Sequence, residues 1–449
     1  MAFDFSLAND LITPIRPHRV EQLFSPNTRT SNRFANDVTY RITDHSVDYA
    51  RGKIITAVTD AASQYPIQST GIKVGKHQRP NSVLEAQHLG DTVTSNHSLD
   101  TTYSKNDLIP QYKPVGRLKE PSPIRAVSFH PSGDVFAIGS NARTLQICVY
   151  PSDEAIKKIL EGGEPPSPLE VSFKCLQIHR GSVYCCGFNE TGDLLATGSN
   201  DQTVHLIKYD SRKRMPTGNE YKFSMHSGTV RDLCFMRGSS GSDTLLTAGA
   251  GDNKIYATDC TTLTQVQSFQ GHKGAVMSIH CWDDSDSFVS GGADGASRLW
   301  DLRSKRCCAV VDPNPPEEVS RAPVGVVRIE PTGKLLASGY KDGKCMLYDV
   351  RGGRVVQLFR AHDDEIRTLN YSPKSYYLLT ASYDCKVKLV DLQGDLTRRL
   401  PSVDIAQLSD KVVQTAWHPI DYNFVTTSAD GHATLWTIPE WTENGEISV

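Results

Sequence analysis

Four side chains within one stretch of the chain, 271–303, could carry out chemistry together. The stretch reads GHKGAVMSIHCWDDSDSFVSGGADGASRLWDLR and contains His272, Ser290, Asp294 and Trp300. A serine, a histidine and an aspartate are the members of a nucleophilic triad, in which the histidine takes the serine proton. Buried side chains of the same types can instead satisfy one another's hydrogen bonds and hold tight turns in place. We interpret the four as structural.

Two short apolar runs separated by polar turns would position these side chains. Ser290 falls on one expected strand, Asp294 in the tight turn after it and Trp300 on the next strand, while His272 comes from the preceding loop. A Gly-His pair at the start and a Trp-Asp pair at the end are typical of one blade of a WD-repeat β-propeller. The spacing lets all four side chains converge.

Six weaker copies of this stretch recur along the chain, roughly every 45 residues. The residues at the Trp300 position are Cys148, Ile207, Thr258, Tyr348, Val390 and Trp436. Supporting polar residues recur at His179, Thr197 and Asp201, at Ser338 and Asp342, at His362, Thr380 and Asp384, and at Thr426 and Asp430. The first copy has Ala142 in place of the turn aspartate, so its turn must be held in another way. Seven units predict an all-β fold, a seven-bladed WD-repeat β-propeller over residues 111–438.

The seventh unit ends before it can form a complete blade. Its third strand, 433–438, is followed by Pro439, which begins a polar tail over 439–449. The missing outer strand must come from elsewhere, and residues 115–118, just ahead of the first unit, are the obvious donor. We expect this strand to close the ring by pairing the two ends of the propeller.

Composition excludes several classes of protein. The 449 residues are 38% hydrophobic and 22% charged, with a formal net charge of -3, which gives no global attraction to nucleic acid or an anionic membrane. We expect no membrane span and no signal peptide. The eleven cysteines all lie beyond residue 147 without C-x-x-C spacing. We therefore expect reduced, mostly buried thiols of an intracellular protein, with no metal site and no cofactor.

Two segments outside the expected strands show other patterns. Residues 1–110 are rich in Asn, Ser, Thr, Pro and Asp and contain neither Cys nor Trp, which is typical of an extended arm. Within it, apolar residues at helical spacing over 47–63 predict one short amphipathic helix. The insertion 151–169 contains SDEAIKKILEGG, a possible short helix capped by Ser152 and ended by Gly162 and Gly163.

One position in each unit is informative about binding. It follows the first apolar residue of the expected innermost strand, near the narrow face where loops gather around the channel. The residues there are Arg125, Tyr184, Arg231, Met277, Gly325, Arg367 and Val413. Arginines beside a tyrosine and a methionine predict a recognition surface for an acidic peptide or an acidic protein face. Alternatively, the arginines pair with local acids such as Asp232 and Asp364.

Several stretches resemble the C-terminal propeller of the nemitin family of microtubule-associated WD-repeat proteins. They are RAVSFHPSGDVFAIGSNARTLQICVYP (125–151), KFSMHSGTVRDLCF (222–235), CMLYDVRGGRVVQ (345–357) and LLTASYDCKVKLVDLQGDLTRRLP (378–401). The resemblance implies a non-enzymatic adaptor linked to microtubules, to minus-end-binding proteins and to the central microtubule pair of motile cilia. Nemitin proteins carry N-terminal helical dimerisation motifs, whereas this chain has the polar arm.

We therefore expect a scaffold in a large complex on microtubules or the ciliary axoneme, within the cytoplasm and cytoskeleton. Its expected partners are microtubule or axonemal proteins, with tubulin among the candidates. No small-molecule, nucleic-acid or membrane partner is expected. The alternative is a substrate receptor of a cullin-RING ubiquitin ligase. The ends Trp300-Asp301-Leu302-Arg303 and Tyr348-Asp349-Val350-Arg351 resemble its adaptor-docking motif. No enzyme motif with a strand-turn nucleophile or a phosphate loop occurs.

Overall fold

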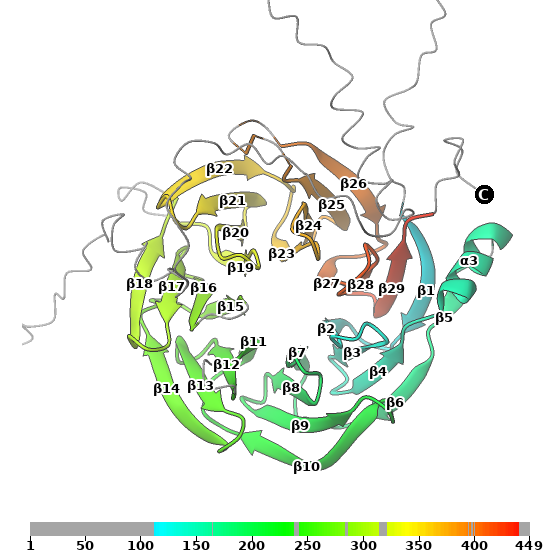
Figure 1. Ribbon diagram of the computed structural model, residues 1–449, viewed down its shortest axis with the longest axis horizontal. Coiled ribbons are helices and arrows are strands. Elements are labelled where there is room, and N and C mark those ends of the chain that lie inside the picture. Colours follow the sequence, from blue (N-terminus) through cyan, green and yellow to red (C-terminus); the bar gives the residue numbers. More distant parts are fainter. Residues whose placement is uncertain are drawn as a thin grey trace, which may run out of the picture. The chain divides into compact units, whose positions relative to one another are not determined.

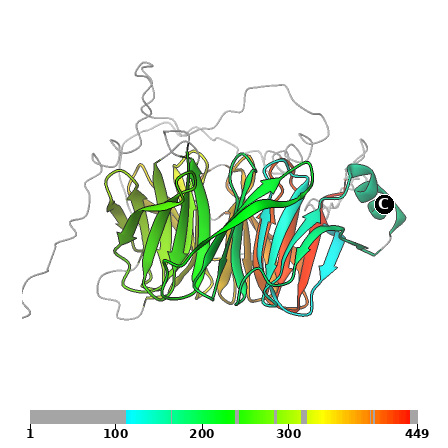
Figure 2. The same cartoon turned by 90° about the horizontal axis from the view of Figure 1, so that it is seen from below.

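The computed structural model describes residues 112–163, 165–237, 242–282, 286–313, 321–393, 395–396, 398 and 400–439. These residues form seven sheets, built mainly of antiparallel strands and arranged as blades of a ring (Figure 1). Seen from the side, the strands run roughly along the axis of that ring (Figure 2). The expected seven-bladed propeller is confirmed. The arm over 1–110, its expected helix at 47–63 and residues 440–449 of the tail lie outside the described residues.

Each blade contributes four strands, ordered from the channel outward. The first contains β2 (Ile124–Phe129), β3 (Val135–Ser140), β4 (Leu145–Val149) and β6 (Val171–Cys175), and the second contains β7 (Val183–Phe188), β8 (Leu194–Ser199), β9 (Val204–Asp210) and β10 (Met215–Phe223). The third contains β11 (Val230–Arg237), β12 (Asp243–Gly249), β13 (Lys254–Asp259) and β14 (Thr264–Gln270). The fourth contains β15 (Val276–Cys281), β16 (Ser287–Gly292), β17 (Ser297–Asp301) and β18 (Arg306–Val311).

The remaining blades follow the same order. The fifth contains β19 (Val324–Ile329), β20 (Leu335–Tyr340), β21 (Lys344–Asp349) and β22 (Arg354–Arg360), and the sixth contains β23 (Ile366–Tyr371), β24 (Tyr377–Ser382), β25 (Lys386–Asp391) and β26 (Ser402–Gln407). The seventh contains β27 (Val412–Trp417), β28 (Phe424–Ser428), β29 (His432–Thr437) and, from the start of the propeller, β1 (Lys113–Lys119).

The burial of each strand follows from its place in the blade. The second strands, such as β3 with the sequence VFAIGS and β20 with LLASGY, are buried at every position because neighbouring blades cover both of their faces. The outer strand β14, TQVQSFQ, is mostly exposed. The seven hydrophobic clusters combine residues of adjacent blades, as where Val289 of blade four packs with Val324 of blade five. The core is therefore a ring of contacts between sheets.

The strand register explains the recurring marker position. Trp300 pairs with Phe288 of the second strand in its blade. The other six markers pair with a large apolar residue at the equivalent place, namely Phe136, Leu195, Leu245, Leu336, Leu378 and Phe424. The marker can change from Trp to Cys, Ile, Thr, Tyr or Val because the backbone pairing stays the same.

Strand β1 closes the ring at the seventh blade. It pairs antiparallel with β29, from Lys113 opposite Thr437 to Lys119 opposite His432. The expected donor strand is thus present and extends beyond 115–118 at both ends. The Glu120 backbone N–H also donates to the Gly431 carbonyl at 2.8 Å. The first and last described blades are therefore joined by main-chain hydrogen bonds.

The insertion after β4 covers the outer edge of this closing strand. Its short strand β5 (Ser167–Pro168) pairs parallel with β1, so this sheet has five strands. A Cβ at Gly116 would lie 2.6 Å from Leu169, which shows how closely the insertion approaches. Figure 1 shows helix α3 (Asp153–Gly162) outside the ring beside β1 and β5.

Helix α3 has the caps that its sequence predicts. The Ser152 hydroxyl accepts from the Ala155 backbone N–H at 3.3 Å, and Gly163 ends the helix in the left-handed conformation with φ 60°. Ile156 and Ile159 are buried in the same cluster as Val115 of β1. This helix therefore packs its apolar side onto the closure of the ring.

We expect a Val115→Ala substitution to lower the free energy of unfolding by about 2 kcal/mol, because it deletes methyl groups from the closure core. Val115 is fully buried in an outer-strand bulge. Val266, 58% exposed in the equivalent bulge of β14, is a matched control. Val266→Ala should change the unfolding free energy by less than about 0.5 kcal/mol. Urea-unfolding midpoints of both variants measure the difference, and equal effects would contradict a closure that depends on β1.

Candidate protein-interaction site

The structure brings His272, Ser290, Asp294 and Trp300 into one buried chain of hydrogen bonds. The Trp300 Nε1–H donates to Ser290 Oγ at 2.7 Å, and Ser290 Oγ lies 2.7 Å from His272 Nε2. His272 Nδ1 lies 2.9 Å from Asp294 Oδ1. All partners are satisfied when Nδ1–H donates to the carboxylate and Nε2 accepts from the serine hydroxyl. Ser290 is 0% exposed, so its oxygen cannot reach a substrate.

The electrostatics of this chain favour a neutral histidine beside an ionised aspartate. Burial lowers the pKa of His272 below its usual value, even though Asp294 opposes that shift. Burial raises the pKa of Asp294, but hydrogen bonds from His272 and from the Lys273 backbone outweigh it and hold that pKa well below the usual range. The four side chains therefore link the loop before β15 to the turn after β16 by hydrogen bonds. We call such a hydrogen-bonded set a pin.

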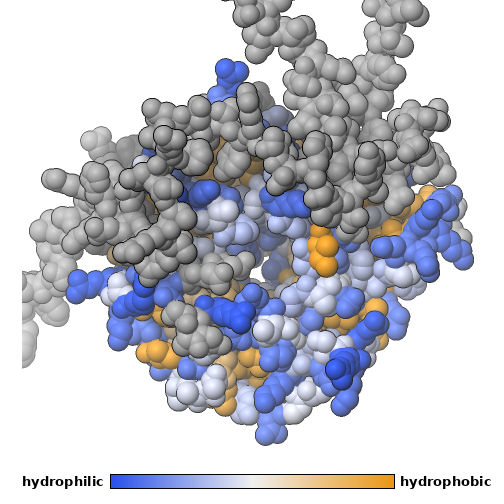
Figure 3. All heavy atoms as spheres, in the orientation of Figure 1, coloured by the Kyte–Doolittle hydropathy of each residue, from blue (hydrophilic) through white to orange (hydrophobic). Residues whose placement is uncertain are grey.

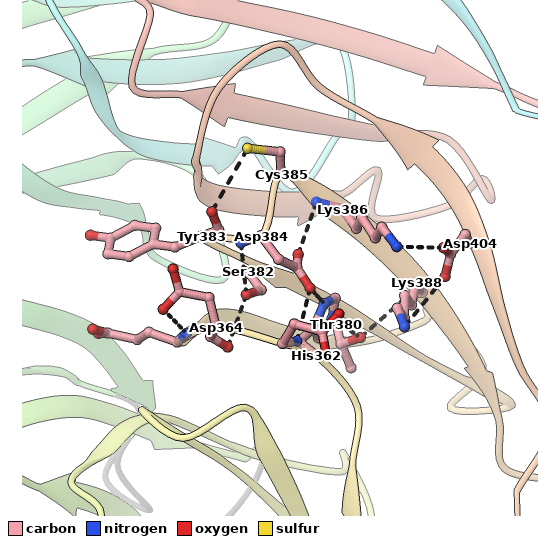
Figure 4. Close-up of polar contacts among 12 residues, drawn as sticks. His362, Asp364, Thr380, Ser382, Tyr383, Asp384, Cys385, Lys386, Lys388 and Asp404 are labelled. Carbon is pink, nitrogen blue, oxygen red and sulfur yellow. Dashed lines mark hydrogen bonds and ion pairs between the residues drawn. The ribbon is translucent and has the colours of Figure 1, made fainter.

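Related pins occur in other blades. In blade six, drawn in Figure 4, His362 Nε2 lies 2.9 Å from Thr380 Oγ1, and its Nδ1 lies 2.9 Å from Asp384 Oδ2. In blade seven, which has no matching histidine, the Trp436 Nε1–H donates to Thr426 Oγ1 at 2.9 Å. The same chemistry thus serves blades whose sequences differ.

Blade two carries a more crowded version. His179 Nε2 lies 2.9 Å from Thr197 Oγ1, and its ring lies 3.8 Å from the ring of His205. Burial lowers the pKa of each imidazole to about 4, although Asp201 favours the charged form of both and Glu220 that of His205. Two neutral rings can stack at this distance, whereas two charged rings would repel each other.

Blade three contains a pin that our sequence analysis missed. His226 Nε2 lies 2.9 Å from Thr247 Oγ1, and Nδ1 lies 3.4 Å from Asp252. His226 follows Met225 in place of the usual glycine, and it lies 21 residues before Thr247 where the equivalent pairs in blades two, four and six are 18 residues apart. Neither the dipeptide nor the spacing therefore marks it in the sequence. Blade one has no histidine in this role. There Ser140 Oγ lies 2.7 Å from Thr144 Oγ1 and accepts from the Ala142 backbone N–H, which holds the turn that lacks an aspartate.

We call the position that follows the first apolar residue of each innermost strand the rim position. It coincides with a β-bulge in all seven innermost strands. The pairing of each strand with its neighbour skips this one residue, as between Ile124 and Ala126 or between Val230 and Asp232. The seven skipped residues are Arg125, Tyr184, Arg231, Met277, Gly325, Arg367 and Val413. A bulge redirects a side chain away from the regular alternation of its strand. In each blade, therefore, one rim residue is left out of the regular strand pairing.

Three of these residues form a stacked group. The guanidinium carbon of Arg125 lies 5.3 Å from the centroid of the Tyr184 ring, and that of Arg231 lies 5.2 Å from the same centroid. Arg125 Nε–H donates to Asn141 Oδ1 at 2.9 Å. Arg231 Nε is buried and has no hydrogen-bond acceptor among the described residues. The ring holds two guanidinium groups, and each can still offer its terminal N–H groups to a carboxylate.

A second aromatic and cationic group lies between blades six and seven. Arg367 lies 5.5 Å and Lys411 Nζ lies 4.9 Å from the centroid of the Tyr383 ring. Tyr383 and Lys411 were not predicted, because one lies in the turn after β24 and the other before β27. Arg367 also pairs with Glu365 at 3.1 Å. Figure 4 shows Tyr383 beside Asp384 of the blade-six pin.

The alternative that local acids neutralise the rim arginines holds in part. Arg367 has an acidic partner, but this is Glu365 in place of the expected Asp364. Asp232 instead accepts from Ser278 Oγ–H at 2.8 Å and from the Ile279 backbone N–H at 3.0 Å. Among the described residues, Arg125 and Arg231 have no ion pair within 4.0 Å. Arg125 and Arg231 therefore remain the two uncompensated rim arginines.

The other rim residues contribute differently. Met277 is half-buried, and Val413 is buried at 4% exposure. A Cβ at Gly325 would lie 2.8 Å from the Ile366 carbonyl oxygen, so the backbone of the next blade occupies that space. Blades four, five and seven therefore place no cation at the rim position.

The residues of the expected adaptor motif divide into buried and exposed sets. Trp300 and Asp301 are buried, and Asp349 is partly buried. Arg303 and Arg351 are exposed on the turns of adjacent blades. In the parts of the chain that the structure describes, no cluster of three or more His, Cys, Asp or Glu residues could hold a metal ion. No described helix is long and apolar enough to cross a bilayer.

All eleven cysteines are described, and all are free thiols. Only Cys148, Cys185, Cys186 and Cys345 are buried, and the other seven are partly exposed. The expectation of mostly buried thiols is therefore wrong. The partly exposed cysteines lie on inner strands facing the channel, on outer strands or in turns, where burial on both sides is not available.

Comparison with known proteins agrees with this geometry. The family model described as "WD domain, G-beta repeat" matches residues 112–147, 171–208 and 263–301. The model described as "Anaphase-promoting complex subunit 4 WD40 domain" matches residues 296–374.

Individual relatives are distant. The chain is 27% identical over 224 residues to the guanine nucleotide-binding protein subunit beta of Oryza sativa subsp. japonica, covering 48% of this chain and 58% of that protein. It is 27% identical over 274 residues to the subunit beta-1 of Nicotiana tabacum, covering 59% of this chain and 68% of that protein. It is 25% identical over 268 residues to the periodic tryptophan protein 2 of Arabidopsis thaliana, covering 59% of this chain and 28% of that protein. The chain thus spans little more than half of the rice relative.

We expect Ser290→Ala to destabilise the protein by about 2 kcal/mol or more, because two buried polar atoms, Trp300 Nε1 and His272 Nε2, lose their shared partner. Ser304→Ala, at an exposed turn of the same blade, should stay within about 0.5 kcal/mol. Urea-unfolding midpoints compare the two variants. Equal midpoints would contradict the structural role of the pin.

Stability should also fall on acidification. The lowered pKa values of His179 and His205, about 4, mean that the unfolded chain binds more protons between pH 4 and the usual histidine pKa of about 6.5. The part of the unfolding free energy that depends on these two neutral histidines is therefore present above that pH window and is lost as the pH falls through it. The thermal midpoint should drop from pH 6.5 to 4, and less so in His205→Gln, which cannot be protonated. An equal drop in both proteins would contradict this account.

Proposed function

Because this chain belongs to the WD40-repeat β-propeller family, we propose that it is a non-catalytic scaffold whose rim binds an acidic segment of a partner protein. Members of this family generally act as protein-interaction scaffolds and are typically non-catalytic. The buried Ser290 supports the same reading, because the set of Ser290, His272 and Asp294, which has the composition of a nucleophilic triad, is closed to substrates.

The observation that carries the proposal is the group formed by Arg125, Tyr184 and Arg231. Two guanidinium groups lie over one tyrosine ring, and neither has an acidic partner among the described residues. Stacking holds a guanidinium in a fixed plane, which lowers the entropy lost when it forms a bidentate pair with a carboxylate. Arginine and tyrosine are also the residue types enriched at the centre of protein interfaces.

For the setting, we propose a microtubule-based assembly, with the axoneme of a cilium as the specific location within the cytoskeleton. The support is the resemblance of four propeller stretches to the nemitin family. In this proposal the rim binds a microtubule-associated protein or tubulin, and the arm over 1–110, which lies outside the described residues, anchors the protein within the assembly.

A second candidate function rests on the two exposed arginines of the adaptor motif. Arg303 and Arg351 occupy equivalent turns of neighbouring blades, as docking of a cullin-RING adaptor would require. Co-purification of that adaptor, abolished by Arg303→Ala with Arg351→Ala, would favour this function. A preparation that contains no adaptor would remove it.

We expect the full chain to sediment with polymerised tubulin or with tubulin and its associated proteins, and the double variant Arg125→Ala with Arg231→Ala to sediment at least about tenfold more weakly. The loss of two charge-assisted contacts of the hot-spot kind accounts for that size. The thermal midpoint should stay close to that of the wild type, because both side chains are only partly buried.

Replacing the same two arginines with lysine provides the control. Lysine keeps the charge but loses the planar fork, so binding should be intermediate. Wild-type protein that remains in the supernatant would contradict the microtubule setting. Undiminished sedimentation of the alanine variant would contradict the role of the rim.

A further inference from the structure

The turns between the third and outer strands of blades four and five, which contain Arg303 and Arg351, share a longer sequence pattern that the proposed rim function does not use. They read DLRSKR over 301–306 and DVRGGR over 349–354. Each consists of an aspartate, a branched apolar residue, an arginine, two variable residues and a second arginine. The register is the same in both, with Asp301 opposite Arg306 and Asp349 opposite Arg354.

In both turns the acid points inward and the arginines point outward. Asp301 Oδ1 accepts from the Arg303 backbone N–H at 2.8 Å, and Asp349 Oδ1 accepts from the Gly352 backbone N–H at 2.8 Å. The aspartates thus hold the turns together. The side chains of Arg303 and Arg354 are 68% and 73% exposed. Arg303 Nε also lies 3.4 Å from Asp286 and 3.6 Å from Asp301, and Arg354 Nε lies 3.8 Å from Asp349, so each of these arginines has a local acidic partner while most of its side chain stays exposed.

Further cations extend this surface. Lys305 and Arg306 are exposed in the blade-four turn, and Arg351 is exposed in the blade-five turn. Lys334, in the turn before β20, is also exposed, and its carbonyl accepts from the Val350 backbone N–H at 2.9 Å. Among the described residues, these four side chains have no ion pair within 4.0 Å. We call Arg303, Lys305, Arg306, Lys334, Arg351 and Arg354 the turn surface.

The turn surface and the rim lie at opposite ends of the blades. The rim residues stand at the start of each innermost strand, whereas these turns follow the end of the third strand. Three antiparallel passes, from the first strand to the third, bring the chain to the far end of the blade. Figure 2 shows strands running from one end of the ring to the other. A partner on the turn surface would therefore leave the rim free.

The same turn in blade three shows that its charge is not required by the fold. It reads DCTTLT over 259–264, with Asp259 opposite Thr264. Asp259 Oδ1 accepts from the Thr261 backbone N–H at 2.7 Å, as the equivalent aspartates do in blades four and five. Threonine thus fills both arginine positions without loss of the turn. The arginines of blades four and five need another explanation.

We propose that the turn surface is a second docking site, for a flexible protein segment rich in Asp and Glu. The cations lie on long, exposed side chains of protruding turns, so they can follow carboxylates on a mobile chain. Neither turn carries an aromatic side chain on which a nucleic-acid base could stack. The inward acids Asp301 and Asp349 keep the net charge modest, which suits spaced carboxylates better than a continuous phosphate chain.

The test uses the full chain with Arg125→Ala and Arg231→Ala, together with Arg367→Ala and Lys411→Ala, so that no cation of either rim group contributes. The probe is a fluorescein-labelled peptide of glutamates separated by glycines, and binding is followed by fluorescence anisotropy. Into this parent we introduce Arg303→Thr, Arg306→Thr, Arg351→Thr and Arg354→Thr, as blade three already shows at Thr261 and Thr264. The dissociation constant should rise at least about tenfold, as expected for the loss of four exposed ion pairs.

A control variant removes the same charge elsewhere, through Lys157→Gln and Lys158→Gln on helix α3, Arg117→Gln on β1 and Lys222→Gln on β10, all of which are exposed. It should bind like the parent. A variant with lysine at the four arginine positions should keep most of the binding, which separates lost charge from a damaged turn. Binding should weaken as salt rises from about 0.01 to 0.1 M, over which the screening length falls from about 30 to 10 Å.

Three results would overturn the proposal. They are no binding by the parent at low salt, equal binding by the parent and the threonine variant, and tighter binding of a single-stranded oligothymidylate than of the peptide. Because Arg125, Arg231, Arg367 and Lys411 are replaced by alanine in every protein compared, these outcomes bear on the turn surface and not on the rim. Failure of the rim proposal would instead be seen in the sedimentation of the rim variant.

Discussion

The pairing of β1 with β29 is the constraint on which the rest of the structure depends. A ring of seven sheets has no free ends only if its first and last parts share a blade. Here that blade takes three strands from the end of the propeller and one from its start. The insertion that carries α3 and β5 covers the shared strand, so the closure has its own piece of core around Val115. Every rim residue then occupies a defined place around one channel.

The innermost strand of every blade is an edge strand that faces the channel. Side chains of neighbouring blades form hydrogen bonds with backbone groups of these strands. The Val127 backbone N–H donates to Gln414 Oε1 at 3.0 Å, and the Ile279 backbone N–H donates to Asp232 at 3.0 Å. A strand edge with free backbone groups can pair with another chain, and these side-chain contacts reduce the number of free groups on the channel side. In Figure 3, the coloured residues near the small central opening are mostly hydrophilic. Binding on such a face depends on charge and hydrogen bonds more than on apolar area.

The sequence predicted those features that repeat at a fixed spacing. The seven blades, the closing strand and the hydrogen-bonded set around Trp300 all follow from one stretch and its copies. The rim position was found in the same way, although nothing in an Arg, Tyr, Met, Gly or Val reveals that each sits in a bulge. Contacts that depend on packing between distant segments leave no such pattern in the sequence. Tyr383 approaches Lys411 only because blades six and seven meet, and a two-residue strand such as β5 carries no pattern.

These observations describe a closed ring whose two ends carry different chemistry, with stacked arginines on the rim and exposed arginines on the turns at the other end. The most direct test of the central claim, that the rim and the segment 1–110 are both needed to hold the protein in its proposed assembly, is the fraction of tagged protein retained on detergent-washed axonemes of ciliated cells. The full chain should stay. The double variant Arg125→Ala with Arg231→Ala, and a chain that begins at residue 111, should wash out. Retention of the rim variant at the level of the full chain would contradict the account, as would loss of all three proteins.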